Sequence, residues 1–503
     1  MSTRSSPKKK PNLSLVPKPK AAAPKAAHDT RPPEALLAFM RTGWKPRPTR
    51  KIAKVKGHAN FLARRKALSA KFPGEALVIP TGHEKVRAND TNYRFRPGSD
   101  FYYLTGNVEP DCVLVLEPSG ARSHKHILFV EPNPGRSDDT FYTDRNKGEL
   151  WVGPRLGVPE SKERFGVDAC RPLSELPEYL ANMRGSGAKP FRVLRGYSEG
   201  VEARLPLHRE RDQELATVLS EMRLLKDALE LRELQAAVDS TKRGFEDVIE
   251  RLAQGQSERE VEGVFNLRAR VEGNDVGYGT IAASGANACV LHWTRNDAKL
   301  KPGELLLLDA GVERDSLYTA DITRTLPISG KFSKEQKEIY ELVLEAQTQA
   351  IAAVKPGNDF MEPNRVAMRV LAEGLERLGI LGMSAEEALA DQNQFYKRYS
   401  LHNVSHMLGL DVHDCAQARA ETYRFGKLVP GMVLTVEPGL YFQLDDLTVP
   451  ARYRGIGIRI EDDVVVTARG CRNLSADIPR TVKDVEAWMK SVWKERKVKP
   501  RKA

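Results

Sequence analysis

Hydrophobic and polar positions alternate along the chain in short blocks that predict strands and helices from residue 64 onward. A helical pattern at 64–72 is followed by apolar runs between turn residues, which predict strands at 75–80, 101–106, 112–118 and 126–130. A shorter helical pattern at 35–44 precedes them. The alternation continues to about residue 207 and is typical of an α/β domain.

The second part of the chain opens with residues 208–254, a proline-free stretch with apolar residues at i, i+3 and i+4 that predicts more than one helix. Beyond it, apolar runs predict further strands and longer patterns predict two helices. The strands are expected at 278–284, 304–311, 320–327, 433–442 and 455–467, and the helices near 334–354 and 363–378. This pattern predicts a second mixed α/β (α+β) domain.

Composition excludes several classes of protein. Hydrophobic residues make up 41% of the 503 residues, charged residues 29%, and the mean hydropathy is −0.46, values typical of a globular protein in water. No apolar stretch approaches the ~18–20 residues that a membrane span needs, and the N-terminus lacks the apolar segment of a secretory signal. The five scattered cysteines contain no CxxC pair. We therefore expect a cytoplasmic protein without disulfides.

The positive charge is concentrated at the two ends. Residues 1–56 carry +13 and residues 490–503 carry +6, whereas the whole chain is +12, so the part between them is acidic. Neither end has the alternating aromatic and basic residues of a nucleic-acid stacking surface, so nucleic acid is expected only in weak tail contacts. A transit peptide is the alternative for the first tail. The expected domains are a disordered basic tail (1–30), an N-terminal domain (31–220), a catalytic domain (221–485) and a basic C-terminal tail (486–503).

Four acidic residues occupy positions where a carboxylate is costly. Asp309 closes an apolar strand, Asp321 opens the next one, and Glu437 and Glu461 each lie inside an apolar β run. His406 adds an imidazole. Four carboxylates and one imidazole suit two hard-to-borderline divalent ions, which can share bridging carboxylates. No phosphate-binding loop or serine nucleophile motif competes with this interpretation.

These residues lie in strings that resemble a known superfamily. LLLLDAG, ADITRT, HNVSHMLGLDVHD, TVEPGLY and GIGIRIED, in this order, are similar to the motifs of the pita-bread metallopeptidases, which include methionine aminopeptidase, prolidase, creatinase and aminopeptidase P. The string ANDTNYRFRPGSDFYYLTGNVEPDCVLVLEP resembles the N-terminal domain of aminopeptidase P. The two resemblances cover roughly residues 57–485. They imply an N-terminal creatinase/aminopeptidase P-type α/β domain, followed by a C-terminal pita-bread catalytic domain.

The resemblance also implies a role for each motif residue. The residues that match the metal ligands are Asp309, Asp321, His406, Glu437 and Glu461. Those that match further active-site residues are His292, His402, His413 and Arg459, with Glu437 as the proton shuttle. The expected cofactor is two divalent ions per subunit, Mn²⁺ because oxygen ligands dominate. The loop between the two Asp ligands looks one residue longer than the usual family spacing.

The activity implied is release of the first residue from peptides with proline in second position, by a hydroxide that two metal ions activate. A prolidase restricted to Xaa-Pro dipeptides is the alternative. Creatinase is disfavoured because its relatives lack the metal ligands found here, and a metal-free peptide-binding module is disfavoured for the same reason. The partners expected are peptides with Xaa-Pro N-termini and further copies of the chain in a homo-oligomer, a dimer or tetramer; no membrane partner is expected.

Overall fold

The computed structural model describes residues 32–45, 51–89, 91–185, 190–252 and 256–498, which fall into two compact units. The smaller unit comprises the described residues up to Lys51 together with Pro132–Gly157. The larger unit comprises Ile52–Glu131 and the described residues from Val158 onward. The tail expected at 1–30 and the last part of the tail expected at 486–503 lie outside the described residues.

The smaller unit is built from short helices, namely α1 (Glu34–Met40), η1 (Gly135–Ser137), α4 (Thr140–Thr143) and α5 (Glu149–Val152). Its core contains Leu37, Phe141 and Tyr142, with Met40 packed against them. The hydroxyl of Tyr142 donates to the carbonyl oxygens of Met40 and Arg136. These contacts tie the helix expected at 35–44 to the segment after residue 131.

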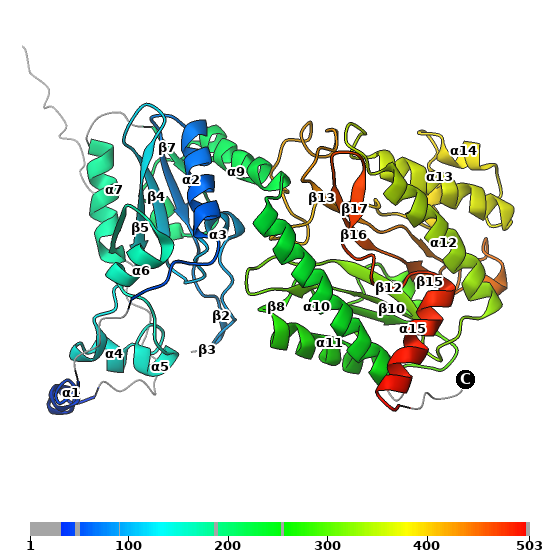
Figure 1. Ribbon diagram of the computed structural model, residues 1–503, viewed down its shortest axis with the longest axis horizontal. Coiled ribbons are helices and arrows are strands. Elements are labelled where there is room, and N and C mark those ends of the chain that lie inside the picture. The colour runs from blue at the N-terminus through cyan, green and yellow to red at the C-terminus, as the bar shows by residue number, and fades with distance from the viewer. Residues whose placement is uncertain (1–31, 46–50, 90, 186–189, 253–255, 499–503) are drawn as a thin grey trace, which may run out of the picture. The chain divides into compact units, whose positions relative to one another are not determined.

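The larger unit begins with a five-stranded mixed sheet in the order β6-β5-β4-β1-β7 (Figure 1). Strands β1, β4 and β5 are antiparallel neighbours, whereas β7 and β6 run parallel to β1 and β5 at the two edges. The strands are β1 (Ala76–Pro80), β4 (Val113–Pro118), β5 (His124–Val130), β6 (Ala169–Pro172) and β7 (Phe191–Val193). A small hairpin, β2 (Val86–Ala88) and β3 (Thr91–Asn92), follows β1.

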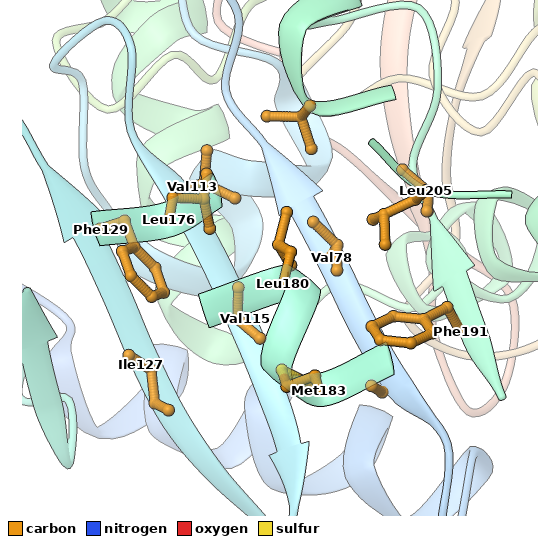
Figure 2. Packing of buried hydrophobic residues seen from close by; sticks show 13 residues of the cluster. Val78, Val113, Val115, Ile127, Phe129, Leu176, Leu180, Met183, Phe191 and Leu205 are labelled. Atoms are coloured by element: carbon orange, nitrogen blue, oxygen red, sulfur yellow. The ribbon is translucent and has the colours of Figure 1, made fainter. Parts of the chain in front are cut away.

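Alternate residues of this sheet build an apolar core on one of its faces. Val113 and Val115 of β4 point to the same side as Phe129 of β5, because strand side chains repeat with a period of two. Figure 2 shows them facing Leu176 and Leu180 of helix α7. The helices of this domain are α2 (His58–Lys71), α3 (Ser99–Thr105), α6 (Val158–Phe165), α7 (Leu176–Gly185), α8 (Glu199–Glu202) and the 3₁₀ helix η2 (Leu173–Glu175).

The prediction of a strand at 101–106 is wrong, because residues 101–105 lie in helix α3 and Gly106 caps it. Every residue of α3 is buried, so the sequence shows neither the alternation of a strand nor the polar face of a helix. Gly106 ends the helix with φ +66°, a left-handed conformation that glycine adopts readily, and its N–H donates to the carbonyl of Tyr102.

Two long helices, α9 (Arg209–Leu224) and α10 (Ala228–Leu252), connect this sheet to the rest of the larger unit. They account for the proline-free stretch at 208–254. The boundary expected between residues 220 and 221 falls inside α9, and the domain limits stay a prediction.

The C-terminal part contains four small sheets, with strand orders β12-β10-β9, β13-β16-β17, β14-β15 and β11-β8. In the first, β10 pairs antiparallel with both neighbours and places Asp309 opposite Thr323. The strands are β8 (Asp275–Val276), β9 (Ile281–Ser284), β10 (Leu305–Ala310), β11 (Val312–Glu313), β12 (Ile322–Pro327), β13 (Val433–Val436), β14 (Gly439–Tyr441), β15 (Gly457–Arg459), β16 (Asp462–Val466) and β17 (Cys471–Asn473).

Helices pack in pairs around these strands. Helix α10 packs on α11, and α12 packs on α13, with strands such as β10, β12 and β16 between the two pairs (Figure 1). The remaining helices are α11 (Glu258–Glu272), α12 (Lys334–Ala353), α13 (Glu362–Arg377), α14 (Ala385–Leu389), α15 (Val482–Glu495), η3 (Gly285–Cys289), η4 (Phe395–Arg398) and η5 (Ala451–Tyr453). Among the described residues, no helix has the length and apolar composition needed to cross a bilayer.

Residues 486–495, expected to belong to the basic C-terminal tail, lie in a helix instead. Helix α15 runs through residues 482–495 and buries Val485, Met489, Val492 and Trp493. Its basic residues dominate the local composition, whereas the apolar residues that anchor it recur three and four positions apart along one face.

Candidate metal centre

Asp309 and Asp321 lie on neighbouring antiparallel strands. Asp309 is the second-last residue of β10 and Asp321 comes directly before β12; the two are 8% and 5% exposed. The hydroxyl of Tyr278 donates to Asp309 Oδ1 at 2.7 Å and contacts Asp321 Oδ1 as well. The loop between the two aspartates turns at Arg314–Tyr318, where the N–H of Arg314 donates to the carbonyl of Tyr318. Because this loop turns back between two antiparallel neighbours, both carboxylates lie at the same end of the sheet.

Glu461 and Glu437 approach from strand ends of two further sheets. Glu461 lies between β15 and β16, is 1% exposed, and its Oε2 accepts the hydroxyl of Thr323 at 2.6 Å. Glu437 follows β13 directly, and its backbone N–H donates to the carbonyl of Val404. The hydroxyl of Thr323 thus orients the Glu461 carboxylate, and a backbone bond fixes the position of Glu437.

His406 lies between Asp321 and Glu437. Its Nδ1 lies 3.2 Å from the carbonyl of Met407, an arrangement that directs Nε2 toward the acids. Nε2 is 3.2 Å from Asp321 Oδ2 and 3.5 Å from Glu437 Oε1. Asp321, His406 and Glu461 each offer one ligand atom, and these atoms lie within 4.8 Å of one another. Asp309 joins this group through Tyr278, and Glu437 joins it through His406.

The electrostatics of the group fit a divalent metal. Burial raises the pKa of Asp321 and of Glu461, and the neighbouring carboxylates raise them further. Burial raises the pKa of Glu437 to about 7. Asp321 and Glu437 outweigh the effect of burial on His406 and raise its pKa to about 9. Four carboxylates this close together repel one another unless a cation or a proton lies between them. Carboxylate oxygens and an imidazole nitrogen are ligands that divalent cations bind.

Arg459 places a buried guanidinium beside the acidic residues of the site. It is 3% exposed, and its Nη2 donates to Asp309 Oδ2 at 2.5 Å. Nη1 donates to the hydroxyl of Tyr441 at 2.9 Å and Nε to Thr323 Oγ1 at 3.2 Å. The bond from Nη2 fixes the orientation of the Asp309 carboxylate, and the other two fix the guanidinium.

The three other histidines expected in the site lie at its edge. Nε2 of His402 is 2.7 Å from the hydroxyl of Tyr441, and burial lowers the pKa of His402 to about 4. The ring of His413 packs edge-on against that of His406, with centroids 4.4 Å apart, and burial lowers the pKa of His413. His292 is exposed. Its charge contributes to lowering the pKa of His402 and of His413, so it is a neighbour of both.

Sequence reasoning missed several residues that hold the acids in place. Tyr278 joins the two aspartates, Tyr441 joins His402 to Arg459, and Thr323 joins Glu461 to Arg459. The carboxylate of Asp463 accepts the backbone N–H of Asp321 at 3.1 Å. Of these residues, Thr323 could have been found from the sequence, because the period-two alternation of a strand shows which residues share its face. The tyrosines lie in apolar runs, where the sequence does not separate a buried ring from a hydrogen-bonding hydroxyl.

Two family models match the chain. Residues 232–468 match the metallopeptidase family M24, and residues 61–190 match the aminopeptidase P N-terminal domain. The first range contains all nine residues expected in the site. The fold is therefore that of an M24 metallopeptidase with the pita-bread catalytic domain.

Curated relatives define the group within this class. The chain is 52% identical to Xaa-Pro aminopeptidase 1 of Streptomyces coelicolor over 460 residues, 91% of this chain and 92% of the relative. It is 36% identical to Xaa-Pro aminopeptidase of Escherichia coli over 86% of this chain and 98% of that protein. The structure of E. coli aminopeptidase P with the inhibitor Pro-Leu matches with a TM-score of 0.78 at 34% identity, over 88% of this chain and 100% of that chain. A Zn-substituted E. coli aminopeptidase P with product matches with the same TM-score, 0.78. The chain belongs to the Xaa-Pro aminopeptidase family.

Proposed function

We propose that this protein is a metal-dependent aminopeptidase that releases the first residue of peptides whose second residue is proline. The observation that carries the proposal is the convergence of three buried carboxylates, the half-buried Glu437 and one imidazole from separate segments, in a chain that belongs to the Xaa-Pro aminopeptidase family. The complete ligand set disfavours a metal-free binding module.

Asp309, Asp321, His406, Glu437 and Glu461 would hold two divalent ions. When bound, the ions would supply Lewis acidity to the substrate carbonyl and to the attacking water. Asp321 lies at the centre of the group, next to both Tyr278 and His406, so it is the residue best placed to serve both ions. Its backbone N–H is fixed by Asp463, which keeps the carboxylate in position.

The chain's own residues then move protons and stabilise charge. Glu437 borders the ligand group through His406 and would take the proton of the attacking water and deliver it to the departing proline nitrogen. His292 and His413, both exposed at the edge of the site, would donate to the carbonyl oxygen as negative charge develops there. His402 lies 3.6 Å from Glu437 and is held by Tyr441, whose hydroxyl also bonds Arg459; it would contact the substrate next to the scissile bond.

Proline explains why a dedicated enzyme is needed. The peptide bond before proline is a tertiary amide without an N–H, so a cleft that binds an extended backbone through that donor loses a bond. A site that activates water and carbonyl directly does not depend on the missing N–H.

Several finer points stay predictions. The oxygen-rich donor set favours Mn²⁺ as the working ion. A homo-oligomer is expected, as is a cytoplasmic location, for which the five cysteines without disulfides are the support. The domain limits 31–220 and 221–485 also stay predictions.

The decisive experiment compares substrate lengths on enzyme refilled with single metals. After chelation and refilling with Mn²⁺, Zn²⁺ or Co²⁺, release of the first residue is measured on an Xaa-Pro dipeptide, an Xaa-Pro-Yaa tripeptide and a longer peptide. We expect kcat/KM to be higher for the tripeptide and longer peptide than for the dipeptide. Cleavage of the dipeptide alone would instead assign a prolidase. Equal cleavage of peptides with alanine in second position would remove proline specificity.

A further inference from the structure

The loop that carries His292 lacks regular secondary structure. It runs from the end of η3 to residue 298, and the side chain of His292 is exposed. Within the loop, the N–H of Thr294 donates to the carbonyl of His292 at 3.0 Å, which makes a tight turn around residue 293. An exposed imidazole on such a loop is positioned by its backbone, so the contacts that hold the loop decide where the ring lies.

Those contacts converge on Glu258, in the first turn of α11. Its side chain is 0% exposed, and its two carboxylate oxygens accept five hydrogen bonds. Oε1 accepts from the backbone N–H and the hydroxyl of Ser284, at 2.7 and 2.9 Å, and from Asn287 Nδ2 at 2.9 Å. Oε2 accepts from Trp293 Nε1 at 2.8 Å and from the backbone N–H of Ala298 at 2.9 Å.

This carboxylate therefore joins the segment before the loop, at Ser284 and Asn287, to the turn at Trp293 and to Ala298 beyond it. Burial alone would raise the pKa of Glu258, but the bonds from Asn287, Ser284 and Trp293 outweigh burial and lower it. All five donors are neutral groups, so these hydrogen bonds, without a cation among them, are what stabilise the carboxylate. The far end of the loop has a second attachment, because buried Asn296 accepts from Ala282 N and donates to the carbonyl of Thr280.

We propose that Glu258 is a positioning residue for catalysis, which fixes the loop around Trp293 and thereby places His292 against the substrate carbonyl. This inference rests on the role proposed above for His292. Glu258 does not touch substrate; it acts through the side chain of Trp293, at the turn, and the backbone of Ala298, after it.

The variant Glu258→Gln tests the inference with little change of shape. Whichever way its amide turns, an NH₂ group faces two or three of the donors that the carboxylate accepted, so those bonds are lost. We expect kcat for an Xaa-Pro-Yaa tripeptide to fall by about 10- to 100-fold, with KM and metal content close to those of the unmodified enzyme. Glu262→Gln, one turn along the same helix at a partly exposed position, is the matched control and should leave kcat unchanged.

A double-mutant cycle with His292→Ala separates positioning from a general structural effect. If Glu258 acts through His292, Glu258→Gln should cost less than about threefold in kcat once the imidazole is gone, because residues that act as a unit are not additive. An equal loss of kcat in both backgrounds would overturn the inference.

A readout independent of activity distinguishes this inference from the proposed function. In Glu258→Gln, the amide of Ala298 should exchange its hydrogen faster and the fluorescence of Trp293, assigned by comparison with Trp293→Phe, should change. If the unmodified enzyme cleaves no Xaa-Pro peptide, the proposed function fails while these signals still test the loop. If Glu258→Gln folds poorly, Trp293→Phe removes one bond of the five and should give a smaller loss of kcat in the same direction. Unchanged exchange and fluorescence in Glu258→Gln would refute the inference.

Discussion

The ring of His413 lies against a metal-ligand candidate without needing to bind metal itself. Its centroid is 4.4 Å from that of His406, and the five ligand candidates supply enough donors for two ions without it. A hydrogen bond from this ring would matter most when charge builds up on the carbonyl oxygen, because the ground-state carbonyl is the weaker acceptor.

We therefore predict that His413→Ala keeps its metal and folded structure but loses turnover. The expected loss is about 10²–10³ in kcat, roughly 2.7–4 kcal/mol of transition-state stabilisation, with a much smaller change in KM. Metal stoichiometry, melting temperature and kcat are measured on one preparation. Normal turnover per folded molecule would remove His413 from the site.

A second residue-scale prediction concerns His126, far from the metal centre in sequence. It is 5% exposed on β5, and Arg65 Nε donates to its Nδ1 at 3.4 Å. Burial, with Arg65 adding to it, lowers the pKa of His126 to about 4, against about 6.5 in an unfolded chain. Between these values the unfolded chain binds a proton that the folded protein does not. Stability from this residue is therefore complete above pH 6.5 and is lost as the pH falls toward 4.

The measurement is the free energy of unfolding in urea at pH 7 and pH 5. We expect His126→Gln, which keeps an acceptor for Arg65, to lose at least about 1 kcal/mol less than the unmodified protein on acidification, since one pKa unit corresponds to about 1.4 kcal/mol. His208→Gln, at an exposed position, is the control. An identical loss of stability in both proteins would contradict the assignment.

The residues of the candidate site divide by what their sequence context reveals. A carboxylate inside an apolar run is costly, so Asp309, Asp321, Glu437 and Glu461 could be proposed as one ligand group from the residues alone. The roles of the histidines came from resemblance, because an isolated His is ambiguous. Tyr278 and Glu258 were not predicted, since their partners lie on segments distant in sequence or in irregular loops.

Among the elements, α15 shows how composition misleads at a chain end. Basic residues suggested a tail, yet Trp493 is 6% exposed and its Nε1 donates to the carbonyl of Ile249 on α10 at 2.6 Å. The ring also fills the space beside Gly330, where an added Cβ would lie 2.5 Å from it. The helix therefore contributes to the core of the C-terminal domain.

We predict that Trp493→Ala destabilises the protein by about 3–5 kcal/mol, because it leaves a large cavity and an unused carbonyl. Trp488→Ala, on the same helix at a partly exposed position, should cost clearly less. Unfolding in urea measures both, and kcat per folded molecule should be unchanged because neither ring is part of the metal centre. Equal stability of the two variants would show that α15 is peripheral.

Most other elements were predictable because one periodicity dominated them. The stretch 208–254 has a clear helical period and contains α9 and α10, and the apolar runs at 304–311 and 320–327 contain β10 and β12. Helix α3 was mistaken for a strand because tertiary burial covers all its sides, which removes the signal that distinguishes the two.

Across the molecule, the N-terminal sheet domain reaches the loop that carries His413. Arg96 Nη2 donates to the carbonyl of Leu410 at 2.6 Å, and Ser99 Oγ donates to Asp411 Oδ1 at 2.5 Å. Arg223, in α9, pairs with buried Asp414 at 3.3 Å. These bonds make the position of the loop that carries His413 depend on residues outside the M24 segment.

The metal centre is itself embedded in strands that pack independently of any ion. Leu307 and Ile281, on β10 and β9, belong to an apolar cluster, and Arg324 is fully buried with its guanidinium bonded to Asp462 and to several carbonyls. The ligands therefore lie on a framework with its own stabilising contacts. Bound ions add stability only by mass action, since they bind the folded state.

We predict that chelation abolishes hydrolysis of an Xaa-Pro-Yaa peptide without unfolding the protein. Far- and near-ultraviolet circular dichroism should be retained, the melting temperature should fall, and Mn²⁺ should restore both activity and melting temperature. The fall follows from linkage, which gives about 2.7 kcal/mol for a ligand at 100 times its Kd. Asp321→Asn, which removes the central ligand, is the matched control: it should show low metal content and little response of its melting temperature to Mn²⁺. Full activity in enzyme shown to be free of metal would overturn the metal-dependent mechanism, whereas loss of the folded signal on chelation would show that the framework depends on the ions.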